Sequence, residues 1–151
     1  MKLDMKVIIG GGLVMYVAQF IVGMVSGMVL HEGVLDPLYK ATTEFWRPEL
    51  NQDPPDMAAL MPRWITVGVF VSLVYAAIYD NIRSALDGSD IIKGLKYGVL
   101  MALFYTLFNL AFSGVFNLPD AIWMWWTLEG FVIYPVGGVA LGWFAGKFGS
   151  N

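Results

Sequence analysis

The chain has no cysteine and only one histidine, which removes several kinds of chemistry at once. Without cysteine it can form no disulfide, no iron–sulfur cluster and no thiol nucleophile. The single histidine, His31, excludes bis-histidine haem ligation within one chain, and no Glu-x-x-His pair is present for a di-iron bundle. A metal site made from His31, Glu32 and loop carboxylates would need a convergence of ligands that their spacing does not supply.

Catalytic and nucleic-acid-binding motifs are also missing. The sequence contains no phosphate-binding glycine loop, no nucleophile elbow and no Ser/His/Asp set. It has no basic stripe, and its net charge of −3 disfavours binding to nucleic acid. We therefore expect no enzymatic activity, no metal, no cofactor and no nucleic-acid partner.

Charged residues are scarce, at 14% of the chain against roughly 25% in an average soluble domain, while 58% of residues are hydrophobic. Four segments are apolar over the length of about 20 residues that a helix needs to cross a membrane: 7–30, 64–82, 97–116 and 121–144. The first is too long for the apolar part of a secretory signal and has no cleavage site after it, so we expect a retained helix. The expected fold class is an all-α integral membrane protein with four transmembrane helices in one bundle. This bundle would form a single domain over residues 1–151, with no room for a soluble catalytic domain.

Lysines and arginines are distributed unevenly between the two sides of the predicted bundle. Six of the nine flank the spans on the side of the chain termini: Lys2, Lys6, Arg83, Lys93, Lys96 and Lys147. The other three lie in the long acidic loop 31–63 on the opposite side. Because cytoplasmic flanks retain an excess of cations, we expect both termini to be cytoplasmic and this loop to be external. The membrane would be a plasma membrane, such as the inner membrane of a bacterium.

Within the loop, residues 36–46 have the pattern of a short amphipathic helix. Asp36 can act as its N-cap, and Pro37 occupies the first helical position. One face carries Leu38, Tyr39, Thr42, Phe45 and Trp46, while Lys40 and Glu44 form an i,i+4 pair on the other side. We expect this helix to lie flat on the outer leaflet, where it either tethers the loop to lipid or serves as a cap or a docking site for a partner.

Two polar residues in the connections are suited to cap helices. Asp56 can cap a last turn of the external loop before Pro62. Ser89 can cap a helix that begins at Asp90 and runs into the third span. These two positions predict where helical structure starts after each connection.

Small residues form stripes on three of the four predicted spans. The first span carries Gly12, Gly23 and Gly27, the third Gly94, Gly98 and Ala102, and the fourth Gly138, Gly142 and Gly146. In a membrane, small residues mark the places where helix backbones approach each other closely. The stripes predict helix packing within one bundle, and three of them in so small a chain also raise the prospect of a homo-oligomer.

One acid, Glu129, lies within the fourth predicted span, in the stretch WTLEGFVIYP. At about 1.5 Å of rise per residue, Asn109 falls in the same layer, Tyr105 one turn deeper and Gln19 nearer the midplane. Because an ionised carboxylate in lipid is costly, we expect Glu129 to face protein or to be protonated, and to hydrogen-bond to Asn109. Glu129 and Gly138 point to opposite sides of their helix, so both sides need a neighbour.

Two functions are compatible with these features. The first is a structural or accessory subunit of a membrane assembly, in contact with lipid and with other membrane subunits. The second is a small oligomeric transporter or channel in which Glu129 exchanges a proton or contacts an ion. The first is favoured because the spans hold a single acid away from their ends, Glu129, and lack the paired, interrupted helices of known carriers.

Overall fold

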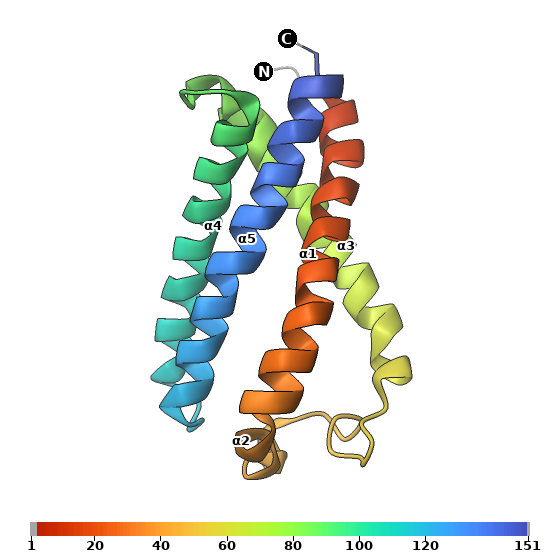
Figure 1. Ribbon diagram of the computed structural model, residues 1–151, viewed down its shortest axis with the longest axis vertical. Helices are drawn as coiled ribbons and strands as arrows, with labels where there is room; N and C mark the ends of the chain where they lie inside the picture. The colour runs from red at the N-terminus through yellow and green to blue at the C-terminus, as the bar shows by residue number, and fades with distance from the viewer. Residues whose placement is uncertain (1–2, 151) are drawn as a thin grey trace.

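The computed structural model describes residues 3–150, and over this range the chain forms helices and no strand (Figure 1). Four helices are long and apolar enough to cross a membrane: Val7–Val34, Met57–Ala85, Asp90–Ser113 and Asp120–Phe148. The expected all-helical class and its four apolar helices are therefore confirmed. Lys2, one of the cations used to orient the chain, lies outside the described residues.

The first long helix consists of three consecutive segments, η1 (Val7–Gly11), α1 (Gly12–Ser26) and η2 (Gly27–Val34), of which η1 and η2 are π-helical. The connection that follows contains the short α2 (Asp36–Lys40) and a 3-10 turn, η3 (Thr43–Phe45). The other long helices are α3 (Met57–Ile82), extended by the 3-10 turn η4 (Arg83–Ala85), α4 (Asp90–Ser113) and α5 (Asp120–Phe148).

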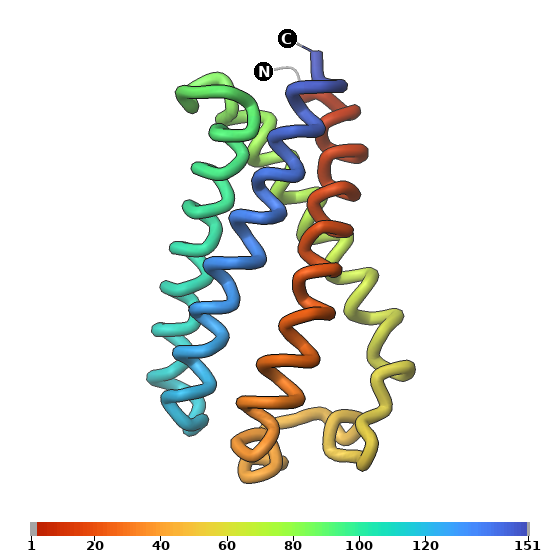
Figure 2. Tube along the Cα trace, viewed as in Figure 1, coloured from red at the N-terminus to blue at the C-terminus, as the bar shows by residue number. Residues whose placement is uncertain are grey.

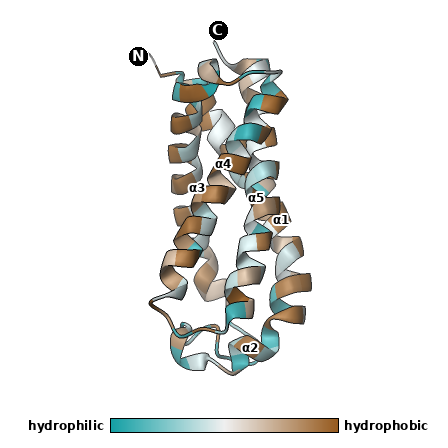
Figure 3. Cartoon of the chain, turned by 90° about the vertical axis from the view of Figure 1, so that its left-hand side faces the viewer, coloured by the Kyte–Doolittle hydropathy of each residue, from teal (hydrophilic) through white to brown (hydrophobic). Residues whose placement is uncertain are grey.

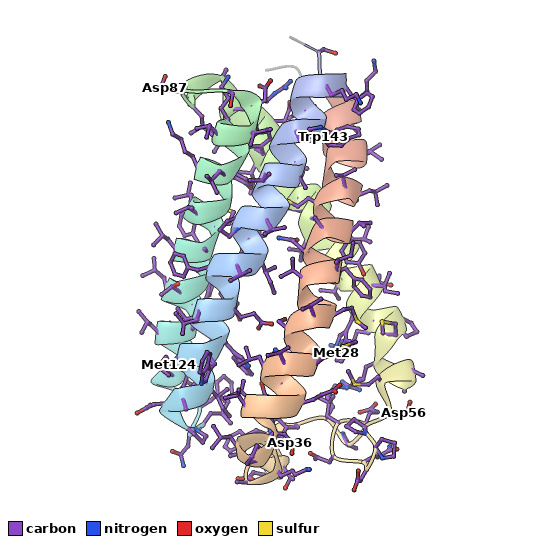
Figure 4. The ribbon with its side chains drawn as sticks, in the orientation of Figure 1. Met28, Asp36, Asp56, Asp87, Met124 and Trp143 are labelled. Atoms are coloured by element: carbon purple, nitrogen blue, oxygen red, sulfur yellow. The ribbon has the colours of Figure 1, made fainter. Side chains whose placement is uncertain are left out.

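The bundle has two distinct ends (Figure 2). Both chain termini lie at one of them, which we call the terminal end, and α2 lies at the other, which we call the loop end. Asp87 and Trp143 are found toward the terminal end, whereas Asp36 and Asp56 belong to the loop end (Figure 4).

Both predicted caps are present. The Asp56 side chain accepts a hydrogen bond from the Ala59 amide at 3.1 Å, and Ser89 accepts one from the Ile92 amide at 3.5 Å. The helix that Asp56 caps does not stop before Pro62, however, but runs through it as α3. A proline inside a helix removes one backbone hydrogen bond, and here the surrounding turns maintain the helix without it.

The long helices expose their apolar side chains (Figure 3). Phe70 on α3 is 67% exposed, and Leu107 on α4 is 61% exposed. A soluble monomer rarely tolerates contiguous apolar surface of this extent, whereas a bilayer provides a matching solvent for it. Packing inside the bundle therefore depends on close contact between helices and on hydrogen bonds more than on the burial of apolar side chains.

Helices α4 and α5 form the most extensive contact in the fold, and glycines make it possible. A β-carbon at Gly94 would collide with the Gly138 carbonyl, and one at Gly98 would collide with the backbone of Tyr134. Gly142 lies against Gly94 in the same way. Two other members of the small-residue stripes also pack against neighbouring helices: Gly146 lies against Asp90, and Gly12 lies against Ser72 and Leu73. The α4–α5 interface is thus backbone against backbone.

Toward the loop end the first helix separates from α3 and from α5, whereas α4 and α5 stay side by side (Figure 1). Helix α3 packs on η1 and α1 but makes little contact with η2, and η2 and α5 are likewise poorly packed through their backbones. Gly23 and Gly27 lie in this region, and a β-carbon at either would meet nothing within 4 Å. Within the described chain, this pair therefore has no packing partner.

The loop segment differs from the predicted continuous helix. Helix α2 ends at Lys40, and the chain then turns into η3. Asp36 is the first helical residue and makes no cap hydrogen bond, since Leu35 occupies the cap position. Lys40 pairs with Asp36, with 2.8 Å between Nζ and Oδ2, so the predicted Lys40–Glu44 pair is wrong. The turn follows from side-chain competition, because the Thr42 hydroxyl and the Trp46 indole both hydrogen-bond to residues of this segment.

At the terminal end, charged side chains fasten the two chain ends together. The Asp4 amide donates to Asp80 at 2.7 Å, and the Ser150 amide donates to the Asp4 carboxylate at 2.5 Å. Arg83 bonds to Asp80 at 3.1 Å and to the Ser150 carbonyl at 2.9 Å. The first and last helices are therefore joined both by packing and by this polar cluster.

Candidate functional site

The intramembrane acid lies at the centre of a hydrogen-bonded network near the loop end. Glu129 is on α5, and its side chain is 13% exposed. The Ser26 hydroxyl donates to Glu129 Oε1, and His31 Nε2 lies 3.2 Å from each carboxylate oxygen. Both partners come from the first long helix. The carboxylate thus bridges two helices whose backbones have separated at this level.

The network continues from His31 to the loop. His31 Nδ1 is 2.7 Å from the Tyr39 hydroxyl, which accepts a hydrogen bond from Trp126 Nε1 at 2.8 Å. Because Tyr39 already accepts from Trp126, its own proton can go to His31 Nδ1. That arrangement leaves His31 Nε2 as a donor to Glu129, and every member of the network is then satisfied.

The Tyr39 ring is enclosed by aromatic neighbours. It stacks on His31, with ring centroids 5.8 Å apart, and meets Trp46 edge to face at 5.1 Å. Trp46 in turn lies 6.1 Å from Trp126. Burial raises the pKa of Tyr39 to about 12. The hydroxyl therefore keeps its proton at neutral pH and remains available as a donor.

An apolar cluster lies against the same residues and fixes the loop segment to α5. Its buried members are Leu30, Leu35 and Ile122, and Leu38, Tyr39 and Trp46 pack against them. Of the five residues on the face predicted to lie against the headgroups, these three therefore contact the protein itself, and Thr42 is buried as well. Only the remaining member of that face, Phe45, is exposed, at 39%.

The π-helical form of η2 explains how Ser26 and His31 reach the same carboxylate. In an α-helix of about 3.6 residues per turn, two residues five apart point about 140° away from each other. In a helix with i→i+5 hydrogen bonds they lie nearly one above the other. The Leu35 amide bonds to the Leu30 carbonyl at 2.8 Å, which is a bond of this i→i+5 type at the end of η2. At the α-helical period, Ser26 and His31 would not lie on one side of their helix. For this reason the sequence did not identify Ser26 as a partner of Glu129.

The predicted polar layer is not one network. Asn109 donates to the Thr127 hydroxyl at 3.2 Å, so the expected hydrogen bond between Asn109 and Glu129 is wrong. Thr127 and Glu129 are two positions apart on α5, which places them about 200° around the helix. Thr127 therefore faces α4, and Glu129 faces the first helix. Counting residues along each span predicts a depth but not the rotation of the helix, so it does not decide which side chains meet.

The other members of that layer also have separate surroundings. Gln19 accepts a long hydrogen bond from the Ser72 hydroxyl at 3.4 Å. The Tyr105 ring lies over Gly130 on α5, where a β-carbon would collide with it. As expected from their nine-residue spacing, Glu129 and Gly138 face different neighbours, the first helix and α4 respectively.

No group of three or more His, Asp or Glu residues in the described range 3–150 could hold a metal ion. The arrangement around Glu129 can share a proton between a carboxylate and an imidazole, or it can serve as a rigid polar brace. Compared with known proteins, the chain matches no family model, no curated protein and no solved structure.

Proposed function

We propose that this protein is a non-catalytic membrane protein that acts as a structural or accessory subunit, with the loop end as its docking platform. The observation that carries the proposal is that Glu129 is bound by Ser26 and His31 of the same chain. An acid placed in a span usually marks either a pathway or a structural partner. Here the chain itself provides the partners, which supports a structural role.

The network also explains how the docking platform at the loop end keeps one conformation. His31 links Glu129 to Tyr39, and Tyr39 links the loop segment to Trp126 on α5. The segment that follows the first helix is thereby held in place by side chains from three parts of the chain. A surface that is already ordered loses less conformational entropy when a partner binds.

The proposed topology places the terminal end in the cytoplasm and the loop end outside, with α2 and η3 near the headgroup boundary. The excess of lysine and arginine near the terminal end supports this orientation. Reporter fusions after the last residue and within residues 51–56 test it. They should report opposite compartments, and a non-cytoplasmic C-terminus would contradict the assignment.

Co-purification tests the accessory role. A tagged chain extracted from its native membranes in mild detergent should migrate in a larger complex of fixed composition. Phe45→Ala changes an exposed residue of the platform and should weaken that complex. Phe70→Ala changes an exposed residue of α3, outside the platform, and should not weaken it. A chain recovered only alone or only with copies of itself would contradict the proposal.

A second candidate is a small oligomeric transporter or channel in which Glu129 exchanges protons. It is favoured by one observation: the His31 side chain is 34% exposed while bonded to the buried carboxylate, which gives a proton a route to the surface. In proteoliposomes with an imposed pH gradient, the wild-type protein should then dissipate the gradient. Glu129→Gln, which retains shape and hydrogen bonding, should not. Equal rates for both would exclude this second function.

A further inference from the structure

The only histidine of the chain joins two different parts of the fold through its two ring nitrogens. His31 Nε2 lies 3.2 Å from each carboxylate oxygen of Glu129 on α5, and Nδ1 lies 2.7 Å from the Tyr39 hydroxyl on α2. Histidine is the side chain whose charge ordinarily changes between about pH 5 and pH 8. The bonds that join α2, α5 and the first helix here therefore depend on the number of protons on this ring.

With a neutral ring, all hydrogen bonds of the network can form together. The Glu129 carboxylate can only accept, so His31 Nε2 carries the ring proton and Nδ1 accepts from the Tyr39 hydroxyl. The Tyr39 oxygen accepts in turn from Trp126 Nε1 at 2.8 Å. Each donor then has an acceptor, and Tyr39 is held between the first helix and α5.

A charged ring cannot maintain the same set of bonds. In the imidazolium form both ring nitrogens are donors, so His31 Nδ1 directs a proton at the Tyr39 oxygen. That oxygen carries its own proton and already accepts from Trp126. Within residues 3–150 the Tyr39 hydroxyl has no hydrogen bond beyond those with His31 and Trp126. Its O–H group thereby loses its acceptor, which is unfavourable for a half-buried polar group.

Tyr39 cannot remove this conflict by releasing its proton. Burial raises the pKa of Tyr39 to about 12, so the hydroxyl stays protonated over the range in which a histidine titrates. The hydroxyl can reach a new acceptor only if the side chain moves away from His31 or Trp126. Such a movement would disturb α2, because Tyr39 packs on the buried cluster that includes Leu35.

The same proton has the opposite effect at the other ring nitrogen. An imidazolium that donates to the Glu129 carboxylate forms a charge-assisted hydrogen bond, which is stronger than one from a neutral ring. Glu129 is only 13% exposed, whereas His31 is 34% exposed and lies close to the end of the helix Val7–Val34. A proton from water can therefore reach the ring. Its uptake strengthens the bridge from the first helix to α5 and weakens the attachment of α2.

The other titratable groups around His31 do not compete for its ring nitrogens. They come from its own helix, from α2 and from α4: Glu32, Asp36, Lys40 and Tyr105. Glu32 is exposed, and Lys40 pairs with Asp36. Tyr105 acts on the network only through its electrostatic interaction with Glu129 and Tyr39. The charge of the ring is therefore the variable that decides which bonds the network makes.

We propose that His31 is a pH-sensitive switch for the loop segment 36–46. When the ring takes up a proton, Tyr39 loses its place between His31 and Trp126, and the segment loosens from α5. When the ring is neutral, the segment is ordered. This change of hydrogen bonds needs only the chain itself. Its use in controlling a partner rests on the proposed function, because only then is the loop end a docking platform.

Nuclear magnetic resonance can follow both ends of the switch in one sample, because the chain has a single imidazole ring. The full-length protein, labelled with ¹⁵N in histidine and tryptophan, is placed in lipid nanodiscs without a partner and titrated from about pH 8 to pH 5. The ring signals should change from the neutral form protonated at Nε2 to the charged form. The Trp126 indole signal, identified with Trp126→Phe, should move with the same midpoint. Trp46 donates to the Tyr39 carbonyl and to Thr42 and should move much less.

A spin label at Lys40, on α2, measures the release of the segment. The mobile population should rise about threefold across the titration, as expected when one hydrogen bond of average strength in a membrane protein is lost. His31→Gln retains a donor for Glu129 but cannot become charged, so its label should not respond to pH. The matched control is Glu32→Gln, which removes the neighbouring acid and should respond as wild type does.

Three outcomes would overturn the proposal. In the first, the ring becomes charged while the Trp126 signal and the label stay unchanged. In the second, the ring does not titrate in this range. In the third, the pH response persists in folded His31→Gln, which would assign the proton to an acid such as Glu129. If His31→Gln does not fold, the two midpoints in wild type decide alone. Because no partner is present, these results do not depend on the accessory role, which the co-purification experiment tests separately.

Discussion

The two ends of the bundle are held together by different means. At the terminal end, helix backbones touch at glycines. A β-carbon at Gly94 or Gly138 would collide with the backbone of the other helix. At the loop end the first helix has separated from α5, and long polar side chains such as Glu129 and His31 span the distance between them. The first arrangement permits almost no adjustment, whereas the second depends on a few hydrogen bonds. The contrast predicts that the loop end changes its conformation more easily than the terminal end does.

The energies expected for the two ends differ accordingly. Overpacking a tightly fitted interface costs about 1–3 kcal/mol, and backbone cannot yield as a flexible side chain can. Side-chain hydrogen bonds inside membranes average about 0.6 kcal/mol in measured cases. Substitutions of the glycines in the α4–α5 contact should therefore have larger effects on stability than substitutions in the Glu129 network.

The largest effect is expected for Gly138→Ala. Its new methyl group would meet the Gly94 carbonyl, so we expect a loss of about 2–3 kcal/mol in the free energy of unfolding. Gly23→Ala is the matched control, because alanine gains the same helix propensity there and meets nothing within 4 Å. Equilibrium unfolding in mixed micelles measures both. Equal stabilities of the two variants would show that the α4–α5 contact is not close-packed.

Glu129→Leu should have a smaller effect, of about 1 kcal/mol, because it leaves Ser26 and His31 without their acceptor. Its clearest sign should be local. A spin label at Lys40, an exposed position on α2, should become more mobile, since the loop segment loses one of its attachments. Glu129→Gln retains an acceptor oxygen and should leave the label as it is in wild type. Unchanged mobility in Glu129→Leu would mean that the network does not hold the segment.

The contrast between the two ends also shows how far the sequence could predict the structure. Hydropathy and length predicted the four helices, and cap chemistry predicted the role of Ser89, because these signals are local. The partners of Glu129 depend instead on helix rotation and on a π-helical segment, neither of which α-helical counting includes. Depth alone therefore predicted Asn109 on α4 as the partner of Glu129. The observed partners, Ser26 and His31, lie on the first long helix.

Tyr39→Phe should have an effect of about 0.6 kcal/mol or less on stability, since it removes a hydroxyl and retains the ring. The local consequence is specific: Trp126 Nε1 loses its acceptor, whereas Trp46 Nε1 donates to the Tyr39 carbonyl and to Thr42 and retains both. In a ¹⁵N spectrum of indole groups, the Trp126 signal should move, and the Trp46 signal should move much less. A stationary Trp126 signal would contradict the proposed link between loop and α5.

The smallest effect is expected at the terminal end, as a dependence on pH. The Ser150 amide donates to the Asp4 carboxylate and, with other local amides, holds the pKa of Asp4 below its usual value, although partial desolvation opposes this shift. A carboxyl whose pKa is lower in the folded state stabilises the fold above its unfolded pKa of about 3.9, and this contribution disappears as the pH falls through the folded pKa. The stability contributed by Asp4 should therefore not vary with pH near neutrality and should decrease only under acid conditions.

Asp4→Asn cannot be protonated in this way, so unfolding measured from pH 6 down to pH 3 should show a shallower acid decrease than in wild type. The Asp80–Arg83 pair should persist in the variant and keep the two chain ends joined. Identical acid profiles for variant and wild type would show that Asp4 does not contribute to the attachment of the terminal end.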